Sequence, residues 1–157
     1  SEPVTQFDAD LGRLIDDMID TMHAAGVIGL SAPQVDVRKR VLVIDLSEDQ
    51  SDPHVYVNPE ILSRGRWGMV EESCLSIPGI TGNVLRATRV RVRAQDRHGS
   101  AFERELENMD AVCLQHEVDH LNGKLFIDRL SIFRRLAIRM SDRSKARKAS
   151  HPEGEAA

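Results

Sequence analysis

The feature that most restricts the fold is a pair of histidines four positions apart, in His116-Glu117-Val118-Asp119-His120. Residues at this spacing lie one turn apart on the same face of a helix, so both imidazoles can reach a single cation. A divalent ion lowers the pKa of a bound water to about 7, and the neighbouring Glu117 could accept its proton. The segment therefore predicts a helix that faces a metal site, although a solvated or packed helix without a metal can carry the same pattern.

The rest of the chain predicts further helices and several short strands. We expect an amphipathic helix over 8–26, with Asp8 as N-cap and Gly26 as stop signal, and the histidine helix over 109–121, with Asn108 as N-cap. A third helix begins at Ser131. Residues 27–34 are interpreted as a loop or irregular edge, and Pro59 is expected to end a strand. Strands are predicted over 41–46, 55–58, 70–76, 88–94 and 101–106, with a turn at 96–99.

These elements predict an α+β fold in one domain. Mostly antiparallel strands would pack around the central metal-binding helix, with an N-terminal amphipathic helix and a C-terminal helix. A length of 157 residues suits a single domain over 1–148, followed by a polar tail over 149–157 that we expect to be disordered.

Composition excludes some partners. The net charge of −4 disfavours a surface that coats nucleic acid, and we expect no specific DNA partner. No run approaches the roughly 18 apolar residues of a membrane span, and no secretion signal precedes the first helix. The expected location is therefore cytoplasmic, with no membrane partner.

Two histidines do not complete a metal site, so a third ligand is needed. Asp128 is the nearest downstream candidate, at the edge of an apolar run. Cys74 upstream is the better candidate, because a thiolate and two imidazoles leave a fourth position open, as in catalytic sites. The other cysteine, Cys113, lies on the apolar side of the helix and is interpreted as a small core residue.

Three blocks, in the expected order, resemble the peptide deformylase family. They are Gly29-Leu30-Ser31-Ala32-Pro33-Gln34, Glu72-Ser73-Cys74-Leu75-Ser76 and Gln115-His116-Glu117-Val118-Asp119-His120. The resemblance extends from near residue 1 to about residue 148. It implies a metal-dependent hydrolase that removes the formyl group from the N-terminal formyl-methionine of newly made polypeptides and releases formate.

The resemblance also implies a role for particular residues. Cys74, His116 and His120 would hold one divalent ion, most naturally Fe²⁺, although Zn²⁺, Ni²⁺ and Co²⁺ suit the same ligands. Glu117 would act first as base and then as acid. The oxyanion would be bound by the backbone N–H of Leu75 and the side-chain amide of Gln34.

The formyl-methionyl peptide would bind beside this centre. The family suggests an apolar pocket for the methionine side chain and main-chain pairing in the manner of an added strand. The pocket candidates are Ile28, Val70, Val112 and Cys113, and the main-chain candidates are Ile28, Gly29 and Ser73. We further expect Asp119 to pair with Arg86, and Glu72 to brace the Cys74 loop.

The chain departs from the family pattern at three positions. Val27 and Ser73 replace glycines, and Ser31 replaces an alanine. A serine at position 73 would be strained only if its φ were positive. None of the three removes a ligand, the base or an oxyanion donor, so we expect activity to survive. Family members also carry a further segment, including an edge strand, before the position of Pro3, so the resemblance implies that this chain starts after it.

Two other functions and one further partner are compatible with parts of the sequence. A zinc endopeptidase would use the same helix but needs a downstream ligand, and a metal-stabilised binding module without activity would not need Glu117 or Gln34. The basic stretch 134–148 is either a solvated helix face or a helix that docks on the ribosome, where rRNA attracts Lys and Arg.

Overall fold

The computed structural model describes the backbone of residues 1–149 and the side chains of residues 1–143. It contains one antiparallel sheet in the order β1-β2-β3-β4-β5. The predicted α+β fold is confirmed. The strands are β1 (Gly29–Ser31), β2 (Val41–Ile44), β3 (His54–Cys74), β4 (Ile77–Gln95) and β5 (Ala101–Glu107). The predicted tail lies, apart from residue 149, outside the described residues.

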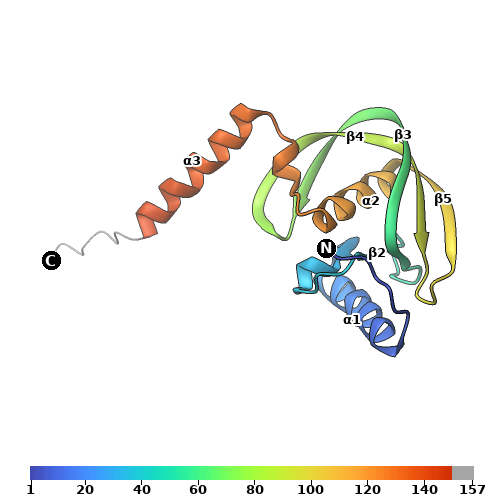
Figure 1. The fold of residues 1–157 in the computed structure, drawn as a ribbon. Coiled ribbons are helices and arrows are strands. Elements are labelled where there is room, and N and C mark those ends of the chain that lie inside the picture. Colours follow the sequence, from blue (N-terminus) through green and yellow to red (C-terminus); the bar gives the residue numbers. More distant parts are fainter. Residues whose placement is uncertain (150–157) are drawn as a thin grey trace.

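The helix α2 (Asn108–Leu121) lies under the arch formed by β3, β4 and β5, as Figure 1 shows. Of the eleven positions from Ala111 to Leu121, all except His116 are buried, in agreement with a central helix. Its side chains join those of the strands in the main core, where Leu114, Val118 and Leu121 pack with Val90 and Val92. The sheet therefore holds the histidine helix on several sides.

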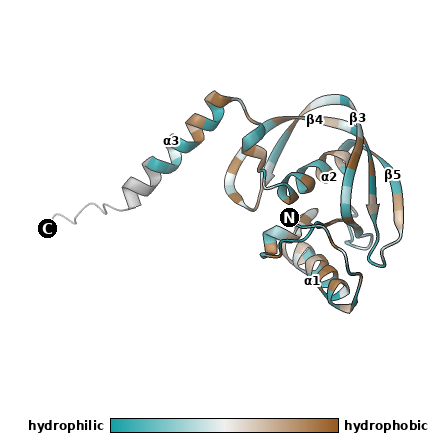
Figure 2. Cartoon of the chain, in the orientation of Figure 1, coloured by the Kyte–Doolittle hydropathy of each residue, from teal (hydrophilic) through white to brown (hydrophobic). Residues whose placement is uncertain are grey.

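The helix α1 (Ala9–Ala25) has the predicted caps. The side chain of Asp8 accepts a hydrogen bond from Leu11 N at 3.0 Å, and Gly26 ends the helix in the left-handed conformation with φ 65°. Hydrophobic and hydrophilic residues alternate around α1 in Figure 2, and its apolar face packs against β1 and β2 in a second core cluster. This packing positions the segment that leads into β1.

Several predicted strand limits are wrong. The strands predicted over 55–58 and 70–76 belong to one long strand, β3, because a register shift between Val57 and Glu60 accommodates Pro59 without ending the strand. Pro78-Gly79 likewise lies within β4, which contains the predicted strand 88–94. The segment 27–34 was expected to be irregular, but it holds β1 and most of the short helix η1 (Ala32–Val35). These elements depend on partners distant in the sequence.

The start of α2 also differs from the prediction. Asn108 is the first helical residue, with φ 53°, and Glu107 occupies the N-cap position without a capping side-chain bond. A left-handed Asn makes the sharp change of direction from β5 into the helix, and asparagine tolerates that conformation better than most residues.

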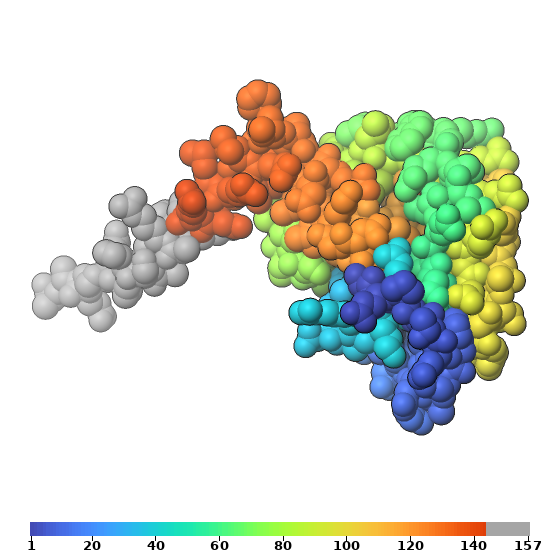
Figure 3. Space-filling model, viewed as in Figure 1, coloured from blue at the N-terminus to red at the C-terminus, as the bar shows by residue number. Residues whose placement is uncertain are grey.

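The helix α3 (Ile132–Ala149) follows the short helix η2 (Phe126–Arg129) and projects away from the body of the molecule (Figures 1 and 3). Ile138 contacts a small core cluster, whereas Phe133, Leu136 and Met140 are exposed. Within residues 1–149, no helix is long and apolar enough to cross a membrane.

Candidate metal centre and active-site cleft

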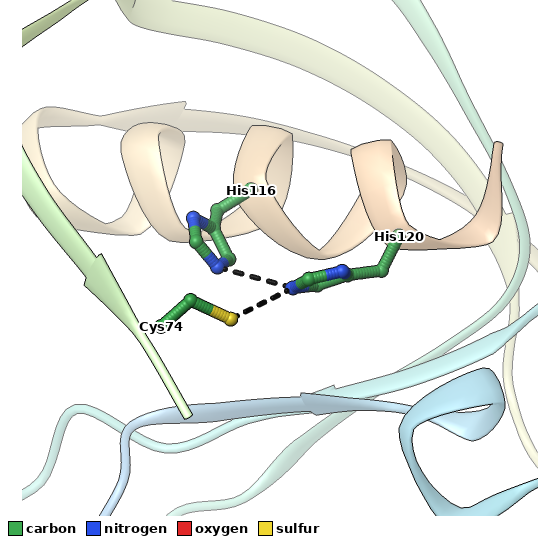
Figure 4. A group of neighbouring side chains, drawn as sticks. All are labelled: Cys74, His116 and His120. Atoms are coloured by element: carbon green, nitrogen blue, oxygen red, sulfur yellow. Dashed lines mark hydrogen bonds between the residues drawn. The ribbon is translucent and has the colours of Figure 1, made fainter. Parts of the chain in front are cut away.

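The three predicted ligands lie together. Figure 4 shows the Cys74 thiol, from the end of β3, facing the two imidazoles of α2. Cys74 Sγ lies 3.3 Å from His120 Nε2, which lies 3.2 Å from His116 Nε2, and the three donor atoms are all within 4.8 Å of one another. Tetrahedral coordination with ordinary bond lengths separates two nitrogens by about 3.3 Å and a nitrogen from a sulfur by about 3.6 Å. The donor set therefore fits one divalent transition metal.

A buried carboxylate orients one of these ligands. Glu72 Oε2 lies 2.8 Å from His116 Nδ1, which leaves Nε2 of that ring for the other two donors. Carboxylates in this position fix the tautomer and the orientation of a metal-binding histidine. Glu72 was expected to brace the Cys74 loop, and it also contacts His116 on the histidine helix.

A buried arginine joins this carboxylate to a second one. The Arg86 side chain is 1% exposed and donates to Glu72 Oε2 at 3.0 Å and to Asp119 Oδ2 at 2.7 Å. The expected pair of Asp119 with Arg86 is confirmed. Arg129, from η2, donates to the same aspartate, a contact that the sequence analysis missed. Both carboxyl pKa values lie below their usual range, since these hydrogen bonds outweigh the effect of burial.

Neighbouring side chains shift the pKa values of Cys74 and His116. Burial raises the pKa of the Cys74 thiol, but hydrogen bonds with His116, His120 and Ser76 outweigh it and lower the pKa to about 5. Burial lowers the pKa of His116, but bonds with Cys74 and Glu72 raise it to about 10. The geometry therefore favours a thiolate at Cys74, which is the form that binds metals.

Glu117 is buried beside the centre with one oxygen unpaired. The residue is 4% exposed, and its Oε2 has no hydrogen-bond partner among the described residues. Burial raises the pKa of Glu117 to about 7, although the two histidines lower it. A carboxyl group with a pKa near neutral can both accept and release a proton at physiological pH.

Gly29 allows β1 to approach this carboxylate. A Cβ atom at position 29 would lie 2.8 Å from Glu117 Oε1 and 2.9 Å from Cys113 Sγ. Any side chain at this position would displace the strand or the glutamate, so glycine is needed here for packing against α2.

The predicted oxyanion donors lie at the same cleft. Gln34 Oε1 accepts hydrogen bonds from the N–H and the hydroxyl of Ser31, both at 2.9 Å. Its Nε2 points the other way, 3.9 Å from Cys74 Sγ and 3.4 Å from Ser76 Oγ. Leu75 lies in the turn that joins β3 to β4 and lines the cleft.

The cleft has a volume of about 660 Å³ and opens onto the metal centre. Its walls contain all six predicted substrate residues, and also Met109 and Ile80, which the sequence analysis did not select. The predicted residues are Ile28, Gly29, Val70, Ser73, Val112 and Cys113. Met109 lies one turn before Cys113 on α2, a helical spacing that could have indicated it.

The remaining candidates have structural positions. Cys113 is buried, as expected for a core residue, although the residue also lines the cleft. Ser73 is not among the described residues with positive φ, so the serine causes no backbone strain. Asp128 accepts a hydrogen bond from Leu125 N at 2.9 Å and does not belong to the Cys-His-His group.

A thiol and two imidazoles within reach of one metal ion, beside a buried carboxylate and an open cleft, define a metal-dependent hydrolase. The sequence model of the polypeptide deformylase family matches residues 1–135. The peptide deformylase of Hahella chejuensis is 54% identical over 140 residues, which are 88% of this chain and 83% of that protein. The peptide deformylase of Pseudomonas aeruginosa is 50% identical over the same shares.

Solved structures agree with this assignment. A crystal structure of a peptide deformylase from Legionella pneumophila superposes with a TM-score of 0.85 at 47% identity, covering 97% of this chain and 90% of that one. That from Thermotoga maritima gives 0.79 at 42% identity, covering 83% and 88%. The chain belongs to the polypeptide deformylase family, whose members hydrolyse the N-formyl amide bond and use a divalent metal. Neither the endopeptidase nor the inactive binding module is supported.

Proposed function

We propose that this chain removes the formyl group from the N-terminal formyl-methionine of newly made polypeptides, and that residues of the cleft bind the metal, transfer the proton and bind the peptide. The observation that carries the proposal is the unpaired, buried oxygen of Glu117 beside the Cys-His-His group. A group of this kind is suited to move a proton during hydrolysis, and no described residue forms a hydrogen bond with its Oε2.

Cys74, His116 and His120 would hold the metal, and we propose Fe²⁺ as the native ion. A divalent ion bound there would polarise the formyl carbonyl and make water nucleophilic near neutral pH. Glu72 and Arg86 keep His116 oriented for this role. Metal analysis after anaerobic purification identifies the ion, and reconstitution of the metal-free chain with each candidate ion compares their activities.

Glu117 would carry the proton between water and the leaving group. It accepts a proton as water attacks the formyl carbon and delivers it to the amine as the C–N bond breaks, which releases formate and the free N-terminus. The amide of Gln34 and the N–H of Leu75 would donate to the negative charge that develops on the formyl oxygen. These donors lie on the wall of the cleft that also holds Cys74.

The edge strand β1 is suited to bind the peptide backbone. Asp45 N donates to Ile28 O at 2.9 Å, so Ile28 bonds toward the neighbouring strand. Backbone groups alternate in direction along a strand, so the N–H and C=O of Gly29 face the opposite, open edge. Main-chain pairing at this edge does not depend on the side chains of the bound peptide. The apolar wall formed by Ile28, Val70, Val112 and Cys113 would accept the methionine side chain.

The decisive assay is formate release from formyl-Met-Ala-Ser. We expect turnover by the metal-loaded chain, loss of activity after removal of the metal with a chelator, and recovery on adding Fe²⁺. Acetyl-Met-Ala-Ser is the matched control substrate, and an unformylated peptide tests for endopeptidase cleavage. A metal-loaded chain that releases no formate would contradict the proposal.

We also propose that α3 contacts the ribosome, where new polypeptides emerge. The helix projects from the body, and the basic residues Arg134, Arg139 and Arg143 alternate with the exposed Phe133 and Met140. Co-sedimentation with ribosomes should fall when the residues after Ser131 are deleted, while turnover of the short formyl peptide is kept. Unchanged sedimentation of the truncated chain would reject this contact.

A further inference from the structure

Ser31 and Gln34 form a capping motif at the start of η1, in which the Gln34 side-chain oxygen accepts from both the backbone N–H and the hydroxyl of Ser31. We propose that the Ser31 hydroxyl is a positioning group that locks the Gln34 amide with its N–H toward the cleft. This inference rests on the proposed role of Gln34 as an oxyanion donor. Ser31 stands where the family pattern has alanine, and an alanine at this position would lack the hydroxyl contact.

The contacts occupy one end of the amide completely. The N–H and the hydroxyl of Ser31 both donate to Gln34 Oε1 at 2.9 Å, and Ser31 is fully buried. A carbonyl oxygen has two lone pairs, so these two donors satisfy it. The contacts of Nε2 with Cys74 and Ser76 are longer, at 3.9 and 3.4 Å. The orientation of the amide is therefore set from its oxygen end.

This orientation matters because the amide of glutamine has two chemically opposite ends. Rotation by half a turn would point Oε1 at the cleft, where it would repel a developing oxyanion instead of donating to it. In Ser31→Ala, only the backbone N–H of residue 31 would oppose this rotation. In the wild type, the hydroxyl of Ser31 is a second donor that opposes it. Pro33 within η1 restricts the backbone between the two residues.

A double-mutant cycle tests the proposal. We expect Ser31→Ala to lower kcat by about threefold to tenfold, the usual effect of one hydrogen bond, with KM changed by less than about twofold. In the Gln34→Ala background the same substitution should have no further effect on kcat. The Ser31 hydroxyl also contacts Glu117, and its single proton can be donated to only one of these two acceptors at a time. An equal loss in both backgrounds would show action through Glu117 and overturn the proposal, as would an unchanged kcat in Ser31→Ala alone.

A second measurement reads the side chain directly. The ¹⁵N relaxation of the Gln34 side-chain amide should show greater mobility in Ser31→Ala than in wild type. Asp128→Ala is the matched control, because it removes the corresponding bond to the N-cap N–H of η2, away from the cleft. If Gln34→Ala leaves kcat unchanged, the oxyanion role of Gln34 fails. The relaxation measurement still tests whether Ser31 positions the Gln34 amide. Unchanged mobility of that amide in Ser31→Ala would reject the positioning role.

Discussion

Replacement of Glu117 by glutamine should lower kcat for deformylation by about 10²–10⁴-fold, the usual contribution of a general acid–base group. The amide has nearly the same size, so it fits the space beside Gly29, but it cannot accept a proton from water. Glu117 does not belong to the Cys-His-His group, so metal content should stay at one ion per chain. Formate release and metal analysis on the same sample provide both measurements.

Glu60→Gln is the matched control, since that glutamate is exposed on β3, and its kcat should equal that of wild type. Loss of metal from Glu117→Gln would instead indicate that Glu117 is a ligand. Unchanged turnover would remove Glu117 from the mechanism.

Replacement of Arg86 by alanine should lower the free energy of unfolding by about 3–5 kcal/mol, because it leaves Glu72 and Asp119 buried without their shared cation. Such a loss is large against the typical total of about 5–15 kcal/mol. Glu72 would also lose the charge that holds it against His116, so metal affinity should fall by up to about 100-fold. Urea denaturation in excess metal and competitive metal titration measure the two effects.

Arg91→Ala is a suitable comparison on the same strand. Arg91 forms a solvent-exposed ion pair with Glu103, and exposed pairs contribute little to stability, so the unfolding curve should hardly move. Equal destabilisation by both substitutions would mean that the Arg86 network has no special importance.

The ligands and the base could be predicted because local spacing carries the information. The two histidines lie four apart on one helix, and Cys74 lies in a block that resembles a family pattern. Helix α1 was also predictable, since its caps and its apolar face are encoded within the segment itself. These features need no knowledge of distant partners.

Other features depend on contacts between distant segments. The continuity of β3 past Pro59 depends on pairing with β4, which a proline in the sequence does not reveal. Arg129 contacts Asp119 only because η2 folds back on α2. The Ser31–Gln34 box is an intermediate case: its S-x-x-Q spacing is a known capping signal, but Ser31 was interpreted only as a departure from the family pattern.

The three ligands come from two separate elements, the tip of a hairpin and a helix. An unfolded chain keeps only the histidine pair in reach of one ion, so the folded form should bind metal far more tightly. Mass action then couples occupancy to conformational stability, adding about 2.7 kcal/mol when the free ion is at 100 times its dissociation constant. When the metal is scarce, a larger fraction of the chain would be unfolded and open to proteases, in addition to lacking activity. Its cellular half-life would then follow the metal supply.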